Sequence, residues 1–186
     1  MNALELTGPI VGKNSAKRIA YGAVLVPGEP DHDGEILSPE RVEQAAHAWM
    51  YGYRNVDYQH TLNKVGIPVE SYILPVPWTV SVNGQSVDLP AGTWILATKV
   101  PDEGVWNEIT SGQLTGYSIM GVRRYAAAAG KSREDDSALK RTLLQDLGED
   151  WVCPAVSFVD EPAVPKAKLF ALKQKPSTWE RFLDFL

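Results

Sequence analysis

The chain has 186 residues, a formal net charge of -5, 44% apolar residues and 22% charged residues. This composition is typical of an ordinary globular protein, and the acidic balance argues against a nucleic-acid partner, which would need a basic face. The apolar runs are shorter than the roughly 20 residues of a membrane-spanning helix. A single Cys153 excludes an intramolecular disulfide, and no signal-peptide pattern opens the chain. We therefore expect a soluble, intracellular, single-domain protein without a membrane partner.

The first third of the chain predicts a strand and a helix. Residues 18–26 form a nearly continuous apolar run, which indicates a strand buried on both faces. A helix is expected to begin at Ser38-Pro39, because a serine hydroxyl accepts exposed backbone N–H groups and proline fits the first helical position. Its buried face follows from three-and-four spacing: Val42, Ala45, Ala46, Trp49 and Met50. His47 lies off this face, so we expect it to face solvent.

The acidic segment Asp31–Glu35 separates the expected strand from the helix. Its carboxylates suggest a metal site, but the segment lacks the third oxygen position and the distant glutamate of a calcium-binding loop. We therefore interpret it as a solvated loop and expect neither a metal nor another cofactor.

The middle of the chain predicts several short strands. Strands are expected at residues 55–59, 65–74 and 93–100, the second of them broken near Pro68. Asn83-Gly84 between two alternating segments, 80–82 and 85–87, is a strong hairpin signal. A short helix capped by Asp102 follows and is expected to stop near Gly112.

The last third predicts three strands, at residues 114–124, 152–159 and 168–172. Between the first two, residues 126–137 are interpreted as an exposed loop or a frayed helix, and a helix is expected from Ser137 to Gly148. An amphipathic helix is expected within residues 173–186, where Ser177 and Glu180 have capping-box spacing. Short strands without regular strand–helix alternation favour an α+β fold: a mainly antiparallel, barrel-like sheet with peripheral helices.

Three of these strand ends carry groups suited to nucleophilic catalysis. Ser118 lies in the apolar run of residues 114–124, His60 follows the strand at 55–59, and Asp160 follows the strand at 152–159. A serine hydroxyl needs a base to take its proton, and histidine needs a third group to orient its ring. Serines and histidines at strand ends are common, however, and spacing alone does not show that these three meet. Cys153 is a weaker candidate, because it lies in an apolar run between Val152 and Pro154, where a buried and inert thiol is expected.

Several segments together resemble the phage prohead (capsid maturation) serine proteases, relatives of the herpesvirus assemblin proteases. The resemblance spans about residues 18–170, and the segments that carry it are Tyr21–Pro27, the Asp31–Gly34 loop, Ser38–Met50, Asp57–His60, Val69–Ser71, Ala91–Trp94, Gly112–Gly121 and Val156–Ala163. It implies an assemblin-like fold with a β-barrel-like core at about residues 18–172. It also implies a serine endopeptidase that cleaves scaffold and capsid-protein extensions, and itself, during prohead maturation.

The resemblance also implies roles for individual residues. His60 matches the general base and Ser118 the nucleophile of this family. Many relatives carry a glutamate where this chain has Ala155, so the orienting acid is assigned to Asp160, with Glu161 in reserve. Asp160 has an alternative interpretation as a turn carboxylate that caps the loop before Pro165.

Oxyanion stabilisation requires preorganised N–H donors, and the backbone around Ser118 offers candidates. These are the amides of Gly121, Val122 and Arg123, or the Arg124 side chain through a water.

The resemblance also implies that the protein acts in the host cytoplasm, inside an assembling prohead. The implied partners are the scaffold and the major capsid protein, and the implied oligomer is a dimer or a ring. The exposed Ala126–Ala129 run is a candidate self-cleavage site or simply a flexible loop. Two other functions stay open: a non-catalytic module that binds scaffold during head assembly, and an esterase or amidase that uses the same serine on small molecules.

Overall fold

The computed structural model describes residues 17–30, 36–82, 84–123 and 151–170, and most of them belong to β-strands. A seven-stranded sheet has the following order: β7 (Gly116–Arg123), β8 (Trp151–Val159), β2 (Val56–Tyr58), β3 (Lys64–Ile73), β6 (Trp94–Lys99), β1 (Ile19–Leu25) and β9 (Leu169–Phe170). In the described part of the chain, β2 and β8 form a parallel pair, and every other strand pairing is antiparallel.

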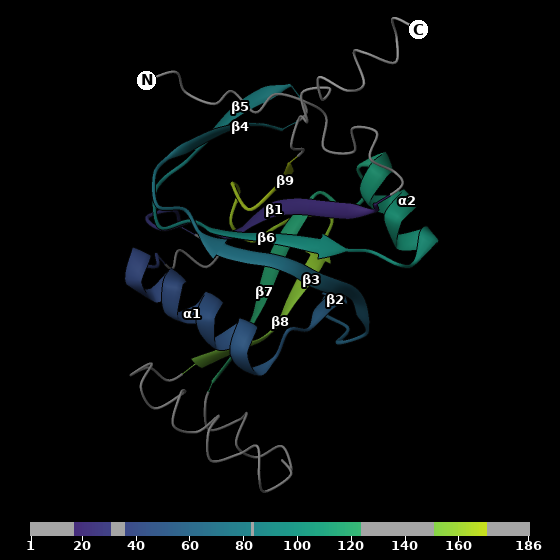
Figure 1. Ribbon diagram of the computed structural model, residues 1–186, viewed down its shortest axis with the longest axis horizontal. Helices are drawn as coiled ribbons and strands as arrows, with labels where there is room; N and C mark the ends of the chain where they lie inside the picture. Colours follow the sequence, from purple (N-terminus) through teal and green to yellow (C-terminus); the bar gives the residue numbers. More distant parts are fainter. Residues whose placement is uncertain (1–16, 31–35, 83, 124–150, 171–186) are drawn as a thin grey trace, which may run out of the picture.

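The sheet curves until its two ends meet. The Tyr117 N–H donates to the Ala167 carbonyl at 3.0 Å, and the Leu169 N–H donates to the Thr115 carbonyl at 3.0 Å. These bonds join the start of β7 to the segment that leads into β9, at the opposite end of the strand order. Figure 1 shows the result: β1, β6 and β3 run across the view, whereas β7 and β8 run steeply behind them. The expected α+β class with a mainly antiparallel, barrel-like sheet is confirmed.

Helix α1 (Pro39–Gly52) begins where the sequence predicts. Ser38 is the N-cap, and its Oγ accepts the Arg41 N–H at 3.4 Å. Val42, Ala45, Ala46 and Trp49 are buried on this helix, as the spacing predicts, and His47 is exposed. Met50, the fifth residue predicted on the buried face, is only partly buried against the core. Trp49 packs edge-on against Trp94 of β6 with ring centroids 5.4 Å apart, so α1 is fixed against the sheet.

Helix α2 (Glu103–Ser111) is also set by its caps. Asp102 Oδ1 accepts the Val105 N–H at 2.8 Å, and Gly112 ends the helix in the left-handed conformation with φ of 78°. Glycine suits this position because it has no Cβ to clash there. Both helix boundaries expected from the sequence are confirmed.

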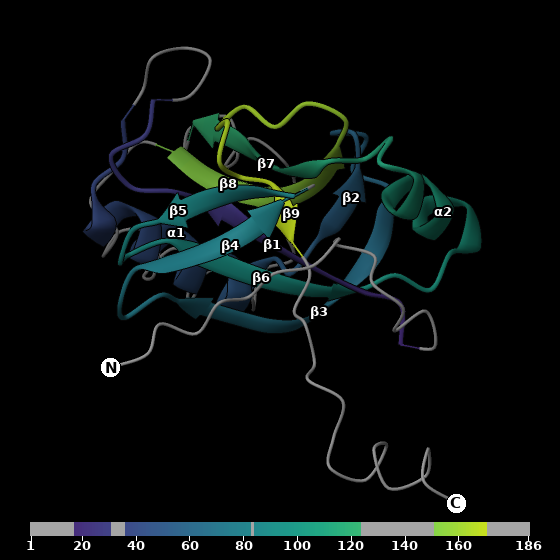
Figure 2. The ribbon, with the colours of Figure 1, turned by 90° about the horizontal axis from the view of Figure 1, so that it is seen from above.

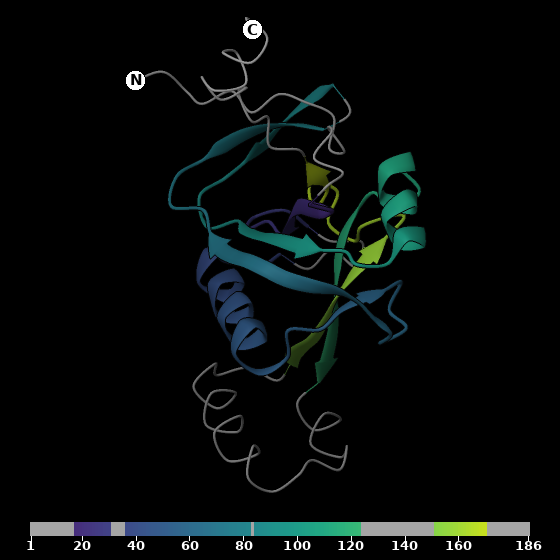
Figure 3. The same ribbon diagram turned by 45° about the vertical axis from the view of Figure 1, so that its right-hand side comes forward.

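The predicted hairpin is formed by β4 (Trp78–Val82) and β5 (Gln85–Leu89), which pair in register as a separate two-stranded sheet. Figure 2 and Figure 3 show the hairpin lying over one end of the curved sheet. Apolar side chains of the hairpin pack there against those of β1 and β6, in a cluster that includes Val80, Leu89, Ala23 and Ile95. The hairpin therefore closes this end of the barrel-like core.

A larger apolar cluster joins the sheet to both helices, and Tyr117 lies fully buried within it. The Tyr117 ring stacks on Phe158 with centroids 4.9 Å apart, and its hydroxyl lies 2.7 Å from Thr98 Oγ1. Burial raises the pKa of this phenol well above its usual value. Tyr117 thus ties β7 to β8 and β6 immediately beside Ser118.

One expected strand differs from the sequence prediction. The break expected near Pro68 is instead a register shift between Pro68 and Glu70, and β3 continues through it from Lys64 to Ile73. A bulge accommodates a residue without a backbone N–H while the strand continues.

Other expectations fall outside the described residues: the loop at residues 31–35, the segment and helix within residues 124–150, and the helix within residues 173–186. The single-domain assignment for residues 1–186 stays a prediction. Among the described residues, no helix is both long and apolar enough to cross a membrane.

Candidate active site

Ser118 lies in the middle of β7, directly opposite Ser157 of β8. The residue is buried, with 7% of its surface exposed. Because successive side chains of a strand alternate between faces, the burial of Tyr117 in the core turns Ser118 to the other face of the sheet. The antiparallel register then puts the Ser118 and Ser157 side chains on the same face, as cross-strand neighbours.

Ser157 connects this strand pair to His60. The Ser157 Oγ lies 2.9 Å from Nδ1 of His60, which is a hydrogen-bonding distance. Ser118 and His60 are therefore both immediate neighbours of one fully buried hydroxyl. Among the described residues, the structure forms no hydrogen bond between His60 and Ser118 themselves.

The backbone around His60 is held in an unusual conformation. Gln59, His60 and Leu62 have φ values of 46°, 59° and 63°, in the left-handed region. Each such non-glycine residue costs about 1–2 kcal/mol. A turn that concentrates this strain is expected where the surrounding structure enforces a functional geometry.

Hydrogen bonds from both neighbouring strands hold this turn. The Gln59 N–H donates to the Phe158 carbonyl of β8 at 3.0 Å, and the Tyr58 N–H donates to the Asn63 carbonyl at 3.2 Å. The Leu62 N–H donates to Oδ2 of Asp57 at 2.8 Å. His60 is therefore presented by a fixed turn between β2 and β3.

Asp57 is fully buried within β2 and pairs with Ser157 in the parallel register of β2 and β8. Side chains of Ser118, Ser157 and Asp57 consequently form one row across three adjacent strands. Oδ2 of Asp57 accepts the Leu62 N–H, whereas Oδ1 is buried and has no hydrogen-bond partner among the described residues. A buried carboxylate oxygen without a donor is costly and calls for an explanation.

Asp160, the sequence-based choice for the orienting acid, lies just beyond β8 and is exposed. Its Oδ1 accepts the Glu161 N–H at 2.9 Å, which fits the alternative interpretation as a turn carboxylate. Glu161 is exposed as well. Within the described part of the chain, neither carboxylate hydrogen-bonds His60, so the role of Asp160 stays a prediction.

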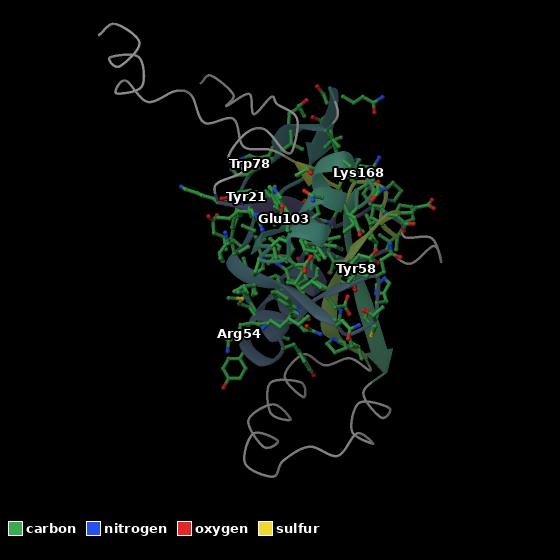
Figure 4. The ribbon with its side chains drawn as sticks, turned by 90° about the vertical axis from the view of Figure 1, so that its right-hand side faces the viewer. Tyr21, Arg54, Tyr58, Trp78, Glu103 and Lys168 are labelled. Carbon is green, nitrogen blue, oxygen red and sulfur yellow. The ribbon has the colours of Figure 1, made fainter. Side chains whose placement is uncertain are left out.

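Asp160 nevertheless contributes to the electrostatics beside this turn. The pKa of Tyr58 is raised, first by a hydrogen bond with Glu108 of α2, then by partial burial and by the charges of Glu108 and Asp160. Figure 4 looks from the side that carries α2 and shows Tyr58 below that helix. Acidic groups therefore border the His60 turn on its α2 side.

The predicted oxyanion donors lie at the end of β7. The pairing of β7 with β8 shifts register between Met120 and Val122, so Gly121 lies at a bulge. A bulge leaves one residue outside the regular ladder, which frees backbone groups for other partners. The assignment of Gly121, Val122 and Arg123 as oxyanion donors stays a prediction.

The competing nucleophile, Cys153, is buried. Burial raises the pKa of its thiol to about 12, which keeps it protonated at neutral pH. The prediction that Cys153 is buried in the core is confirmed. Among the described residues, no three metal-ligating side chains gather into a metal site.

Sequence reasoning did not assign roles to Ser157 or Asp57, although both lie in the segments that carried the resemblance. A signal was present in each case. Asp57 is a charged residue between Val56 and Tyr58, and Ser157 is a polar residue between Val156 and Phe158. A polar side chain inside an apolar strand is expected to have a buried partner. The partners became visible only through the pairing of β2 with β8.

Comparison with known proteins adds the family. Residues 7–126 match the family described as "Putative phage serine protease XkdF". The chain is 29% identical over 156 residues to the "Uncharacterized protein YqbD" of Bacillus subtilis (strain 168), a match that covers 83% of this chain and 47% of that protein. It is 35% identical over 107 residues to the "Phage-like element PBSX protein XkdF" of the same organism, covering 57% of this chain and 37% of that protein.

These matches cover less than half the length of either relative. No solved structure matches the chain. The family match spans well over half of the sequence and includes both His60 and Ser118. The chain therefore belongs to the family described as putative phage serine protease XkdF.

Proposed function

We propose that this protein is a serine endopeptidase that cleaves scaffold and capsid-protein extensions, and itself, during maturation of a phage prohead. The observation that supports this most strongly is that Ser118 and His60, which are far apart in the sequence, are both neighbours of Ser157. The family's description as a phage serine protease agrees with it. An assemblin-like relationship is part of this proposal and rests on the sequence resemblance.

In the proposed reaction, the Ser118 Oγ attacks the carbonyl carbon of the scissile peptide bond. His60 takes the hydroxyl proton and then donates it to the leaving amine, so that water can hydrolyse the acyl-enzyme. Because Nδ1 of His60 faces Ser157, Nε2 is the nitrogen that serves Ser118. Catalytic hydrogen bonds are often long before substrate binds, and in this proposal the bond between His60 and Ser118 forms in the complex with substrate.

Charge develops on the carbonyl oxygen when Ser118 attacks, and backbone N–H groups are the best donors for it. The bulge at Gly121 is the closest irregularity of β7 to Ser118 and supports the choice of the amides at 121–123. Asp160 remains a candidate for the orienting acid in this proposal, with Glu161 in reserve.

The proposed setting is the interior of an assembling prohead in the host cytoplasm. Its scaffold and major capsid protein are the proposed substrates and partners, and a dimer or ring is the proposed oligomer. The composition supports an acidic globular protein that acts on proteins rather than on nucleic acid.

The decisive experiment incubates the protein with the scaffold and capsid proteins of its own phage and identifies fragments by mass spectrometry. We expect fragments with the wild type and none with Ser118→Ala. Ser86→Ala is the matched control, because Ser86 is an exposed serine on β5, in the hairpin sheet rather than the seven-stranded one. Intact masses of the same samples report self-cleavage, including any within Ala126–Ala129. Equal fragments with wild type and Ser118→Ala would contradict the proposal.

A second candidate is a non-catalytic head-assembly module that binds scaffold. Two observations favour it: His60 and Ser118, both among the described residues, form no hydrogen bond with each other, and Ser118 is largely buried from solvent. The same incubation separates the two functions. A non-catalytic module would bind the head proteins and produce no fragment that depends on Ser118.

A further inference from the structure

Oδ1 of Asp57 is a buried carboxylate oxygen that lacks a hydrogen-bond donor among the described residues. The Asp57 side chain is fully buried, and its Oδ2 accepts the Leu62 N–H. A carboxylate can only accept hydrogen bonds, so Oδ1 needs a neighbour that carries a proton. The strand register supplies one candidate, because Ser157 is the residue opposite Asp57 on β8, although its hydroxyl forms no hydrogen bond with Oδ1 in the structure.

The Ser157 hydroxyl has one proton to donate and lone pairs with which to accept. Its 2.9 Å contact with Nδ1 of His60 can therefore run in either direction, depending on the imidazole tautomer. If Ser157 donates to Nδ1, its only proton is used and Asp57 Oδ1 stays unsatisfied. If Nδ1–H donates to Ser157 instead, the hydroxyl proton is not used by His60. A side-chain rotation that brings the Ser157 hydroxyl within hydrogen-bonding reach of Oδ1 would then satisfy this oxygen, a bond that the structure itself does not form.

We propose that Asp57 is a positioning residue that acts through Ser157 to hold the neutral His60 imidazole in its Nδ1–H tautomer. The chain of donors then runs from Nδ1–H to Ser157 Oγ, and from that hydroxyl to Asp57 Oδ1. In this arrangement the Ser157 hydroxyl and Oδ1 of Asp57 each have a partner. Nε2 is left without a proton, which is the state that a base for Ser118 requires.

The second oxygen of Asp57 strengthens this assignment. Oδ2 holds the Leu62 N–H and so fixes the turn on which His60 lies, with its three left-handed residues. One carboxylate thus controls both the backbone position and the ring state of His60. The inference deepens the proposed function, on which it rests, by giving the orienting role to Asp57 and Ser157.

The test is the tautomer itself, read without substrate. Long-range 1H–15N correlation spectra of the 15N-labelled protein at about pH 8.5, roughly two units above the ordinary histidine pKa, show which nitrogen carries the proton. The chain has three histidines, and His60→Gln assigns the signal of residue 60. We expect Nδ1–H in the wild type.

Asp57→Asn is the informative variant. The asparagine can still accept the Leu62 N–H through its oxygen, but its amide group donates to Ser157, whose proton then turns toward Nδ1. We therefore expect the tautomer to change to Nε2–H while the amide spectrum shows an intact fold. Asp160→Asn is the matched control, and we expect it to keep Nδ1–H.

Three results would overturn the inference: Nε2–H in the wild type, Nδ1–H retained in Asp57→Asn, or a tautomer change in Asp160→Asn alone, which would make Asp160 the orienting acid. If Asp57→Asn does not fold, Ser157→Ala provides the same test, because it removes the link and is also expected to lose the Nδ1–H preference. The spectra do not depend on proteolysis. A protein with the expected tautomers that cleaves nothing would refute the proposed function and leave the inference standing.

Discussion

Ser118 and Ser157 face each other across β7 and β8, and the hydroxyl of Ser157 lies 2.9 Å from Nδ1 of His60. This cross-strand pair makes the candidate site. Ser157, which is neither the proposed nucleophile nor the proposed base, is a neighbour of both Ser118 and His60. The site therefore depends on strand register, since a shift of one residue would turn Ser157 to the opposite face of the sheet.

The first prediction concerns Ser157. Replacement by alanine removes the hydroxyl that contacts His60 and leaves both Nδ1 and the Asp57 carboxylate without this neighbour. We expect the reactivity of Ser118 toward a peptide phosphonate to fall on the order of 100-fold, the lower end of effects typical for general-base catalysis. The measurement is the second-order rate constant of labelling. Ser86→Ala should react like the wild type, and a normal rate for Ser157→Ala would argue against any role of Ser157 in the site.

The second prediction concerns the anchoring of the His60 turn by Asp57. A hydrogen bond to a charged group contributes roughly 1.5–3 kcal/mol. Loss of the Leu62 N–H acceptor in Asp57→Ala should therefore speed hydrogen exchange of the Leu62 amide by about 10- to 100-fold, because 1.4 kcal/mol corresponds to a factor of ten. In Asp57→Asn an acceptor oxygen remains, so protection should be largely kept. Equal exchange rates in wild type and Asp57→Ala would show that the turn is held by other bonds.

The third prediction concerns the packing of β3 against β2 and β6. A Cβ placed on Gly66 would lie 2.4 Å from Thr98 Cγ2 and 2.9 Å from Val56 Cγ1. We expect Gly66→Ala to lower the free energy of unfolding by about 1–3 kcal/mol, as overpacking does. Thr98→Ser removes the nearest methyl group and keeps the hydroxyl that bonds Tyr117.

The double variant should therefore recover part of that loss in urea denaturation, and only part, because the contact with Val56 remains. If Gly66→Ala unfolds at the wild-type urea concentration, the close approach of these strands is not as tight as the structure indicates.

The fourth prediction is a pH dependence that arises from Cys153. Burial raises the pKa of this thiol to about 12 from 9.0, so the folded state favours the protonated form. Its contribution to stability is fully present below pH 9 and is lost as the pH rises toward 12. The loss approaches about 1.4 kcal/mol per pH unit within this window.

Urea denaturation at pH 8 and pH 10 checks this prediction. Other groups titrate in the same range, so the relevant quantity is the difference between the wild type and Cys153→Ala. The wild type should lose roughly 1 kcal/mol more than the variant between the two pH values. Parallel losses in both proteins would mean that the thiol is not buried in the folded state.

Local features of the fold could be predicted from the sequence because they depend on neighbouring residues. Ser38 and Asp102 cap their helices through contacts within three residues, and the hairpin signal in the sequence correctly predicted that β4 and β5 pair directly. Helical spacing alone predicted that the His47 side chain faces solvent, and this residue is exposed in the structure. A barrel-like sheet was predicted from the sequence. The particular hydrogen bonds that close the sheet were not, because they join residues far apart in the sequence.

The candidate site was predictable only in part for the same reason. Ser118 and His60 could be found by their chemistry and by the resemblance. Ser157 and Asp57 matter because β2 runs parallel to β8, a pairing between segments about a hundred residues apart that no local pattern specifies. The sequence pattern favours Asp160, just after the strand at 152–159, as the orienting acid, whereas the buried carboxylate that neighbours Ser157 is Asp57, within β2.

The central claim is that Ser118 and His60 react as a pair, and active-site labelling tests it most directly. A fluorophosphonate is added to the wild type, Ser118→Ala, His60→Ala and His47→Ala, and mass spectrometry identifies the modified residue and the rate. His47 is the matched control because it is an exposed histidine on α1. We predict a single adduct on Ser118, absent in Ser118→Ala, slowed on the order of 100-fold or more in His60→Ala and unchanged in His47→Ala. An adduct on another residue, no adduct at all, or equal rates with and without His60 would contradict the account.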